Sequence, residues 1–381
     1  MTIDGGNRPE VDAEEILEGV LAWVELETPT AEAAAVNHLV DHVENAFRNL
    51  GAEIERTPGR DGFGDILCAR TPWGGEGPGI LVLAHLDTVH PIGTSKGELP
   101  IRRQGDWVYG PGIYDMKTGG YFGYYAYRHL RRLGLRTPLP VTFLFLPEEE
   151  VGSPTSRPLI EAAARRAKYV LVPEPARDGG RVVTARKGVA DFHLTVTGRP
   201  SHAGARHQDG RSAIREMARQ VLRLEEMTDY ERGITVSVGT IQGGTAINVV
   251  PASCSADIDV RVPDAAAAAE VKAMFDGLEP FDPDCQIAVT GDLNRPAFEK
   301  SEGITALLAH AQALAAELGF ELLDTYSGGG SDGNFSAALG VPTLDGLGPD
   351  GAGAHTLEER IMVSSLAPRA ALMIRLLQTL E

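Results

Sequence analysis

The stretch Gly79-Ile80-Leu81-Val82-Leu83-Ala84-His85-Leu86-Asp87 joins a continuous apolar run to a histidine and an aspartate. The run is too short for a helix of its own, and a strand that is apolar at every position is typical of a sheet buried on both faces. Two similar runs follow at residues 141–146 and 169–172. Helical patterns precede and separate the runs, at residues 11–27, 31–50, 119–133 and 159–167. This alternation predicts an α/β fold with a mostly parallel central sheet.

Residues 186–297 have a different pattern and predict a second, inserted domain. Strands and helices follow in the order β-α-β-β-α-β, which is the ferredoxin-like α+β arrangement. The strands are expected at residues 189–196, 234–241, 255–262 and 285–289, and the helices at 212–227 and 265–275. A helical pattern at residues 304–318 resumes the first domain, which is therefore expected to comprise residues 1–185 and 298–381.

Composition narrows the class of protein. The 53 acidic and 35 basic residues give a formal net charge of -18, which argues against a nucleic-acid partner. Cys68, Cys254 and Cys285 form no Cys-x-x-Cys pair, so neither a disulfide framework nor a thiolate metal site is expected. The acidic segment Met1–Glu15 has no apolar signal region, and no apolar run is long enough to span a bilayer. These features predict a soluble cytoplasmic protein without a membrane partner.

Polar side chains that bind metals follow each apolar run. His85 and Asp87 follow the first run, Glu148-Glu149-Glu150 the second, and Glu174 the third. Ligands of open parallel sheets bind at the carboxyl ends of the strands, so these side chains are expected at one edge. Each has an ordinary alternative, because His85 alone would fit a structural histidine and the glutamates would fit a solvated helix start.

Two further candidates lie in glycine-rich segments. Asp115 follows Gly110-Pro111-Gly112-Ile113-Tyr114, and His355 follows Gly353-Ala354. Asp115 alone would fit a turn aspartate. Taken as a set, imidazole and carboxylate ligands without thiolate favour zinc, or manganese or cobalt, at a catalytic site. Two such ions need a bridging carboxylate, and a free carboxylate would then serve as general base and acid.

Several motifs together resemble those of a known family, the co-catalytic zinc peptidases. This family includes glutamate carboxypeptidase of the carboxypeptidase G type, acetylornithine deacetylase, succinyl-diaminopimelate desuccinylase and aminoacylase. The resemblance covers essentially the whole chain. It rests on residues 85–87, 112–117, 149–153, 173–175, 198–204 and 353–355. Ser-His-Ala-Gly-Ala at 201–205 and Gly-Gly-Gly-Ser-Asp at 328–332 are most similar to the glutamate carboxypeptidase branch.

The resemblance implies a role for each residue of the candidate centre. Asp115 would bridge two zinc ions per subunit, with cobalt or manganese as substitutes, and its peptide bond to Met116 would be cis. His85 and Glu174 would complete one zinc site, and Glu150 and His355 the other. Glu149 would be the general base, with Asp87 as the partner of His85. The run of three glutamates leaves Glu148 as an alternative base, although the following Val151-Gly152-Ser153 favours Glu149.

The resemblance also implies that the inserted domain is a lid through which two subunits form a homodimer. His202 would stabilise the oxyanion in the active site of the other subunit. Asn248 and Arg261 would hold the substrate, and the backbone of Gly329 and Gly330 would approach its carboxylate. Arg261 alone would also fit a surface salt bridge on the solvent-exposed face of a strand.

The implied function is hydrolysis of an amide bond next to a free carboxylate, in a small-molecule or peptide substrate. A carboxypeptidase that releases a C-terminal amino acid, often glutamate, is the first reading, and an N-acyl amino acid deacylase is the alternative. A non-catalytic metal-binding protein is disfavoured because the base and all five ligands are present. A serine hydrolase is disfavoured because no Gly-x-Ser-x-Gly motif is expected at a strand-to-helix turn.

Overall fold

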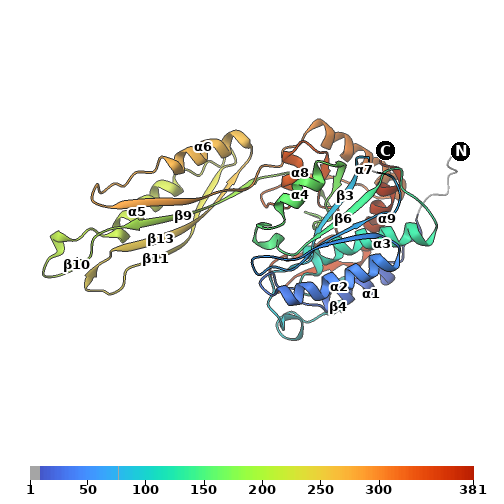
Figure 1. The fold of residues 1–381 in the computed structure, drawn as a ribbon, viewed down its shortest axis with the longest axis horizontal. Helices are drawn as coiled ribbons and strands as arrows, with labels where there is room; N and C mark the ends of the chain where they lie inside the picture. Colours follow the sequence, from blue (N-terminus) through green and yellow to red (C-terminus); the bar gives the residue numbers. More distant parts are fainter. Residues whose placement is uncertain (1–8, 76) are drawn as a thin grey trace. The chain divides into compact units, whose positions relative to one another are not determined.

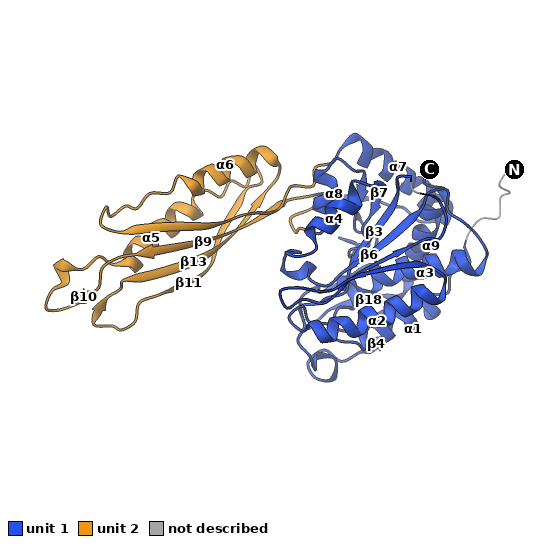
Figure 2. Cartoon of the chain, viewed as in Figure 1, with its two compact units in different colours: residues 1–185, 300–326, 331–381 blue, residues 186–299, 327–330 orange. Residues whose placement is uncertain are grey.

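The computed structural model describes residues 9–75 and 77–381, and these form two compact units (Figure 2). Unit 1 comprises Met1–Ala185, Lys300–Tyr326 and Ser331–Glu381, and unit 2 comprises Arg186–Glu299 and Ser327–Gly330. The first eight residues of the predicted catalytic domain, which open the acidic segment Met1–Glu15, lie outside the described residues. No helix among the described residues is both long and apolar enough to cross a lipid bilayer.

Unit 1 is built on a six-stranded sheet with the order β1-β2-β6-β3-β7-β16 (Figure 1). Its strands are β1 (Glu53–Thr57), β2 (Ile66–Arg70), β3 (Gly79–His85), β6 (Val141–Leu146), β7 (Ala167–Leu171) and β16 (Thr343–Leu344). β6, β3, β7 and β16 pair in parallel, whereas β2 pairs antiparallel with both β6 and β1. The predicted mostly parallel sheet is therefore confirmed, with β1 and β2 added at one side.

Helices cover both faces of this sheet, which explains why β3 is apolar throughout. Ile80, Val82 and Ala84 of β3 belong to the large buried cluster, whereas Leu81 and Leu83 belong to a separate one. The large cluster includes residues of α1 (Ala13–Val24), α2 (Ala33–Asn49), α3 (Thr118–Arg132), α7 (Glu302–Leu318) and α9 (Val363–Thr379). The other cluster includes residues of α4 (Arg157–Ala164) and α8 (Gly333–Ala338). Burial of alternate residues on opposite faces leaves no position for a polar side chain until β3 ends.

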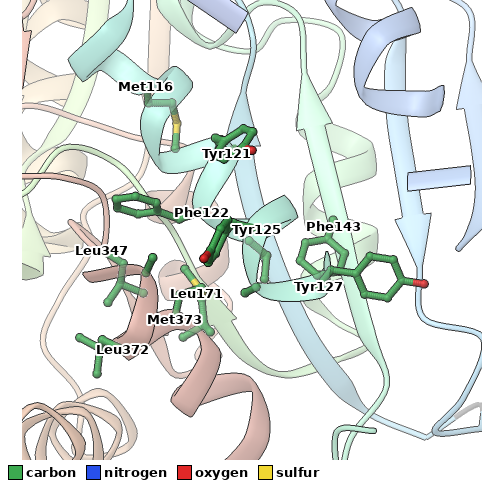
Figure 3. Packing of buried hydrophobic residues seen from close by; sticks show 14 of the residues in the cluster. Met116, Tyr121, Phe122, Tyr125, Tyr127, Phe143, Leu171, Leu347, Leu372 and Met373 are labelled. Atoms are coloured by element: carbon green, nitrogen blue, oxygen red, sulfur yellow. The ribbon is translucent and has the colours of Figure 1, made fainter. Parts of the chain in front are cut away.

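Aromatic side chains dominate the larger cluster. Figure 3 shows Tyr121, Phe122 and Tyr125 of α3 together with Phe143 of β6 and Met373 of α9. This packing fixes α3 against the sheet, and α3 begins directly after Asp115, Met116 and Lys117. The position of Asp115 is thus tied to the core of unit 1.

Two smaller sheets complete unit 1. A four-stranded sheet has the order β17-β18-β5-β4, and a pair joins β15 and β8. Their bounds are Gly351–Ala352, Arg360–Met362, Trp107–Tyr109, Arg102–Gln104, Asp324–Ser327 and Val182–Arg186, in that order of strands. The four-stranded sheet brings β18 beside β5, and so brings the loop that contains His355 beside the loop that contains Asp115.

Unit 2 has the order β9-α5-β11-β13-α6-β14, with a short pair, β10 and β12, between these elements. The elements are β9 (Gly188–Thr197), β10 (Ser201–His202), α5 (Ala213–Glu225), β11 (Thr235–Gly243), β12 (Val249–Val250), β13 (Ser253–Val262), α6 (Ala265–Asp276) and β14 (Gln286–Arg295). The antiparallel sheet has the order β11-β13-β9-β14, which is the ferredoxin-like topology. Its helices bury Phe192, Leu194 and Val196 of β9, while Asp191 and His193 stay exposed on the other face.

Candidate metal centre

Histidine and carboxylate side chains from five separate segments meet at the carboxyl end of the central sheet. His85 ends β3, Glu174 lies three residues after β7, and Glu149 and Glu150 follow β6. Asp115 lies between β5 and α3, and His355 lies in the loop between β17 and β18. Closely spaced ligand atoms occur in two groups, His85–Asp115–Glu150 and His85–Glu149–Glu174. The strand ends thus deliver the side chains that the sequence predicted there.

Asp115 lies between two pairs of side chains. Its Oδ1 is 3.4 Å from His85 Nε2, which is itself 3.6 Å from Glu174 Oε1. Its Oδ2 is 3.3 Å from His355 Nε2, which is 3.0 Å from Glu150 Oε2. The two oxygens of one carboxylate therefore face two different sets of ligand atoms. The Asp115–Met116 peptide bond is cis, as the resemblance implied.

The chemistry of this centre fits a pair of cations. His85 Nε2 and Glu150 Oε1 are buried without a hydrogen-bond partner among the described residues, although such groups are normally paired. A buried carboxylate needs a cation or several donors, and here the side chains of Asp115, Glu150 and Glu174, which are 5 to 11% exposed, surround two imidazoles. Oxygen and nitrogen ligands without thiolate suit zinc, cobalt or manganese.

The pKa values in the centre also indicate a need for positive charge. Burial raises the pKa of Glu150 to about 8, against the hydrogen bond from His355. Burial and the charge of Asp115 raise the pKa of Glu174 well above its ordinary value. Asp115 and Glu150 raise the pKa of His355 to about 11. The proton that Glu150 holds at neutral pH would be released to solvent when a metal binds, since metal ligands are deprotonated.

Asp87 is completely buried and contacts three residues of the centre, His85, Glu149 and Glu150. Its Oδ1 lies 3.3 Å from His85 Nδ1 and accepts a hydrogen bond from the backbone N–H of Glu149 at 3.1 Å. Its Oδ2 accepts from Glu150 N at 3.2 Å and from the Thr30 hydroxyl at 2.7 Å. Asp87 therefore orients the imidazole of His85 through its carbonyl oxygen, 3.0 Å from Nδ1, and through its carboxylate, which also fixes the loop that carries two glutamates.

Glu148 has a different environment from the two glutamates that follow it. It is fully buried, and its Oε1 accepts hydrogen bonds from both the backbone N–H and the hydroxyl of Thr155 and of Ser156, at 2.7 to 3.0 Å. Glu148 is thus engaged at the start of α4. Glu149, by contrast, has a side-chain oxygen within 4.8 Å of ligand atoms of His85 and Glu174.

His355 differs from His85 in exposure and backbone. Its side chain is 53% exposed, against 1% for His85. Its φ of +62° lies in the left-handed region, which is uncommon for a residue other than glycine and clusters at functional sites. The centre therefore has a buried side, with His85 and Glu174, and a more accessible side, with His355.

Glu359 and His90 are parts of this region that the sequence did not reveal. The carboxylate of Glu359 accepts hydrogen bonds from the backbone N–H groups of Gly112, Tyr114 and Asp115 at 2.9 to 3.0 Å. His90 Nε2 lies 2.7 Å from the same carboxylate. No local pattern marks Glu359, because its partners lie more than 240 positions away.

The predicted residues of the inserted domain lie at two ends of unit 2. His202 and Asn248 are together, since Ala203 N donates to Asn248 O at 2.9 Å and His202 pairs with Val249. Arg261 lies at the opposite end of the sheet, eight positions beyond Ser253 along β13. At about 3.3 Å per residue, that separation is roughly 26 Å.

Two further features of unit 2 concern Arg261 and the glycine-rich loop. Arg261 donates from Nε and Nη2 to the Asp259 carboxylate at 2.6 to 3.1 Å, which is the surface ion pair that the alternative reading expected. Gly329 and Gly330 belong to unit 2 and direct their carbonyl groups to the buried Arg186, at 3.2 and 3.4 Å from Nη1. Contrary to the expectation from the sequence, residues 329–333 form a Gly-x-Ser-x-Gly match between β15 and α8. Its Ser331 is fully buried and donates to Asp345 Oδ2 at 2.6 Å, so it is not an exposed nucleophile.

The chain is similar to several known hydrolases. Carboxypeptidase G2 of Pseudomonas sp. strain RS-16 is 32% identical over 367 residues, which cover 94% of this chain and 87% of that protein. Succinyl-diaminopimelate desuccinylase of Delftia acidovorans is 28% identical over 368 residues, which cover 88% and 91%. The solved structure of a tripeptidase from Staphylococcus aureus has a TM-score of 0.79 at 21% identity and covers 97% of this chain and 98% of that one.

Residues 81–379 match the model of the peptidase family M20/M25/M40. That match spans well over half of the 381 residues, and it agrees with the motifs from which the resemblance was drawn. The chain is a metal-dependent hydrolase that belongs to the peptidase family M20/M25/M40.

Proposed function

We propose that this chain is a di-zinc amidohydrolase that cleaves an amide bond next to a free carboxylate and releases a C-terminal amino acid, most often glutamate. One observation carries the proposal: the two oxygens of Asp115 face two separate sets of ligand atoms. His85 and Glu174 would hold one zinc ion, Glu150 and His355 the second, and Asp115 both. When bound, the two ions polarise the substrate carbonyl and make water a better nucleophile.

Glu149 is the proposed general base and acid. Its side chain lies near His85 and Glu174, and its backbone N–H donates to Asp87. From there its carboxylate would take a proton from the attacking water and pass it to the nitrogen of the departing amino acid. Glu148, the alternative, is already engaged by Thr155 and Ser156, which supports Glu149.

The preference for a carboxylate rests on Arg261 and on the similarity to carboxypeptidase G2. A guanidinium donates two parallel hydrogen bonds and so matches a carboxylate. In this structure the Asp259 carboxylate occupies the fork of Arg261. A substrate carboxylate would replace Asp259 or share the guanidinium with it. Asn248, Gly329 and Gly330 are proposed as further substrate contacts.

A homodimer, formed through the inserted domain, is part of the proposal. His202 and Arg261 are roughly 26 Å or more apart within unit 2, too far to contact one small substrate together. If both act on the same substrate, His202 must come from another subunit, where it would stabilise the oxyanion. Exposed apolar side chains on two elements in contact, Ile214 and Leu222 of α5 and Ile241 of the edge strand β11, support a partner here.

The proposal is tested with the zinc-loaded protein and two matched sets of substrates. One set consists of N-acylated dipeptides that differ in the C-terminal amino acid. The other consists of N-acyl amino acids that differ in the acyl group. We expect fastest amino-acid release from substrates with C-terminal glutamate and loss of turnover when the C-terminal carboxylate is an amide. Fast cleavage of short N-acyl groups irrespective of the amino acid would instead identify the N-acyl amino acid deacylase.

A further inference from the structure

Glu359 is a buried carboxylate that the proposed reaction does not use. Its side chain is 1% exposed, yet both of its oxygens face N–H donors. Oε1 accepts from the backbone of Tyr114 and Asp115, and Oε2 accepts from the backbone of Gly112. His90 Nε2 is the fourth neighbour, 2.7 Å from Oε2. Charged hydrogen bonds of this kind are among the stronger ones in proteins, so this carboxylate fixes the backbone of the loop.

The bonds converge on the residue that faces both sides of the centre. The backbone N–H of Asp115 donates to Glu359, and the side chain of Asp115 lies beside His85 and His355. The approach is tight, because a Cβ atom on Gly112 would lie only 2.3 Å from Thr88 Cγ2. The loop therefore has little freedom to shift while the bonds to Glu359 are intact.

The two sides of the centre depend on Glu359 to different degrees. His85 ends β3 and Glu174 follows β7, and these strands are neighbours in the central sheet. Their relative position is set by the sheet. His355, by contrast, is on a loop and lies only four positions before Glu359. One carboxylate thus connects the segment of Asp115 with the segment of His355.

We propose that Glu359, supported by His90, is a positioning residue that sets Asp115 against His355 and so determines the affinity of the second metal position, formed by Glu150 and His355. The first position, formed by His85 and Glu174, depends on it much less. This inference rests on the proposed function, because it requires Asp115 to serve two ions.

Glu359→Gln tests the inference, because glutamine keeps the size but offers one oxygen acceptor in place of two. Its amide nitrogen would face the Gly112 N–H and His90, where two donors meet. Glu358→Gln is the matched control, since it makes the same chemical change in an adjacent side chain that is 70% exposed. Zinc binding to the apo forms is measured by competition with a chromophoric chelator, and cobalt-loaded samples are examined by electron paramagnetic resonance for coupling between the two ions.

We expect Glu359→Gln to retain one tightly bound zinc ion and to bind the second about 10- to 100-fold more weakly, as for other residues that support metal ligands. The cobalt coupling signal should fall in parallel, whereas Glu358→Gln should match the wild type in both measurements. A folded Glu359→Gln protein that binds two zinc ions with wild-type affinities overturns the inference. So does equal weakening of both ions.

His90→Leu decides the matter if Glu359→Gln does not fold. This variant removes one donor and leaves the three backbone bonds to Glu359, so a smaller loss at the second position is expected. Wild-type binding of both ions by folded His90→Leu, together with an unfolded Glu359→Gln, would reduce Glu359 to a folding role and overturn the inference. A wild-type protein that binds fewer than two ions would contradict the proposed function itself, which distinguishes the two failures.

Discussion

Replacing single glutamates in the Glu148-Glu149-Glu150 run tests which of them transfers the proton. Glu149→Gln keeps the shape of the side chain but cannot accept a proton. The backbone of residue 149 is held by Asp87 through its N–H, so the substitution should leave the loop in place. The expected loss is that of general acid–base catalysis alone, about 10²–10⁴ in kcat, or roughly 3–5 kcal/mol.

Glu148→Gln has a different expected result because of the four hydrogen bonds on its Oε1. A charged acceptor contributes about 1.5–3 kcal/mol per bond and a neutral one about 1, so neutralising this oxygen should lower stability by about 2–4 kcal/mol after allowance for non-additivity. Activity per folded, zinc-loaded molecule should stay close to that of the wild type.

The assay combines three measurements on each variant: kcat with a free-acid substrate, zinc content, and melting temperature. Glu149→Gln should have a much lower kcat but keep two zinc ions and the wild-type melting temperature. Glu148→Gln should have a lower melting temperature but keep nearly wild-type kcat per zinc-loaded molecule. An inactive Glu148→Gln beside an active Glu149→Gln would refute the assignment of the base. Loss of one zinc ion from Glu149→Gln would also refute it, because Glu149 would then be a ligand beside His85 and Glu174.

Three further outcomes are expected. Arg261→Ala should lower kcat/KM for a free-acid substrate by a factor equivalent to about 2–5 kcal/mol and should change the residual kcat/KM of the C-terminal amide much less, and an equal loss on both would exclude a carboxylate clamp. A random mixture of His202→Ala and Glu149→Gln subunits should regain roughly a quarter of wild-type activity, since about half of the dimers are mixed and each of these has one intact site of two; purified mixed dimers as inactive as the parents would exclude action in trans. Burial raises the pKa of Glu150 to about 8, so the carboxyl is protonated below that pH and must release its proton when zinc binds. Zinc affinity should therefore rise with pH through about 8 and on toward about 11, where His355 loses its proton, and an affinity independent of pH would contradict these protonation states.

The sequence revealed those parts of the fold whose residues are buried on two sides. β3, β6 and β7 are covered by helices on both faces, so they read as apolar runs, and a polar residue where such a run stops is conspicuous. β1 and β2 were not predicted. β1 has no fully buried residue, and its pattern is set by pairing with β2 rather than by the core.

The ligand residues of the candidate centre were predictable from the sequence, whereas Glu359, which fixes the backbone of Asp115, was not. His85, Glu174 and the glutamates after β6 lie next to strong strand signals, and the family motifs cover Asp115 and His355. Glu359 acts through backbone N–H groups of a distant segment, and any sequence offers those groups. The Asp259 partner of Arg261 was visible two positions away, but only the structure shows that the pair forms.

Asp87 has a mechanical consequence for the reaction. Its carboxylate joins the end of β3 to the loop after β6, through contacts with His85, Glu149 and Glu150. Thermal displacement of that loop must therefore carry the strand end with it, so the spacing between the imidazole and the glutamates fluctuates less than either segment does. A misplacement of about 1 Å can reduce a reaction rate 100-fold, and this junction suppresses that kind of error.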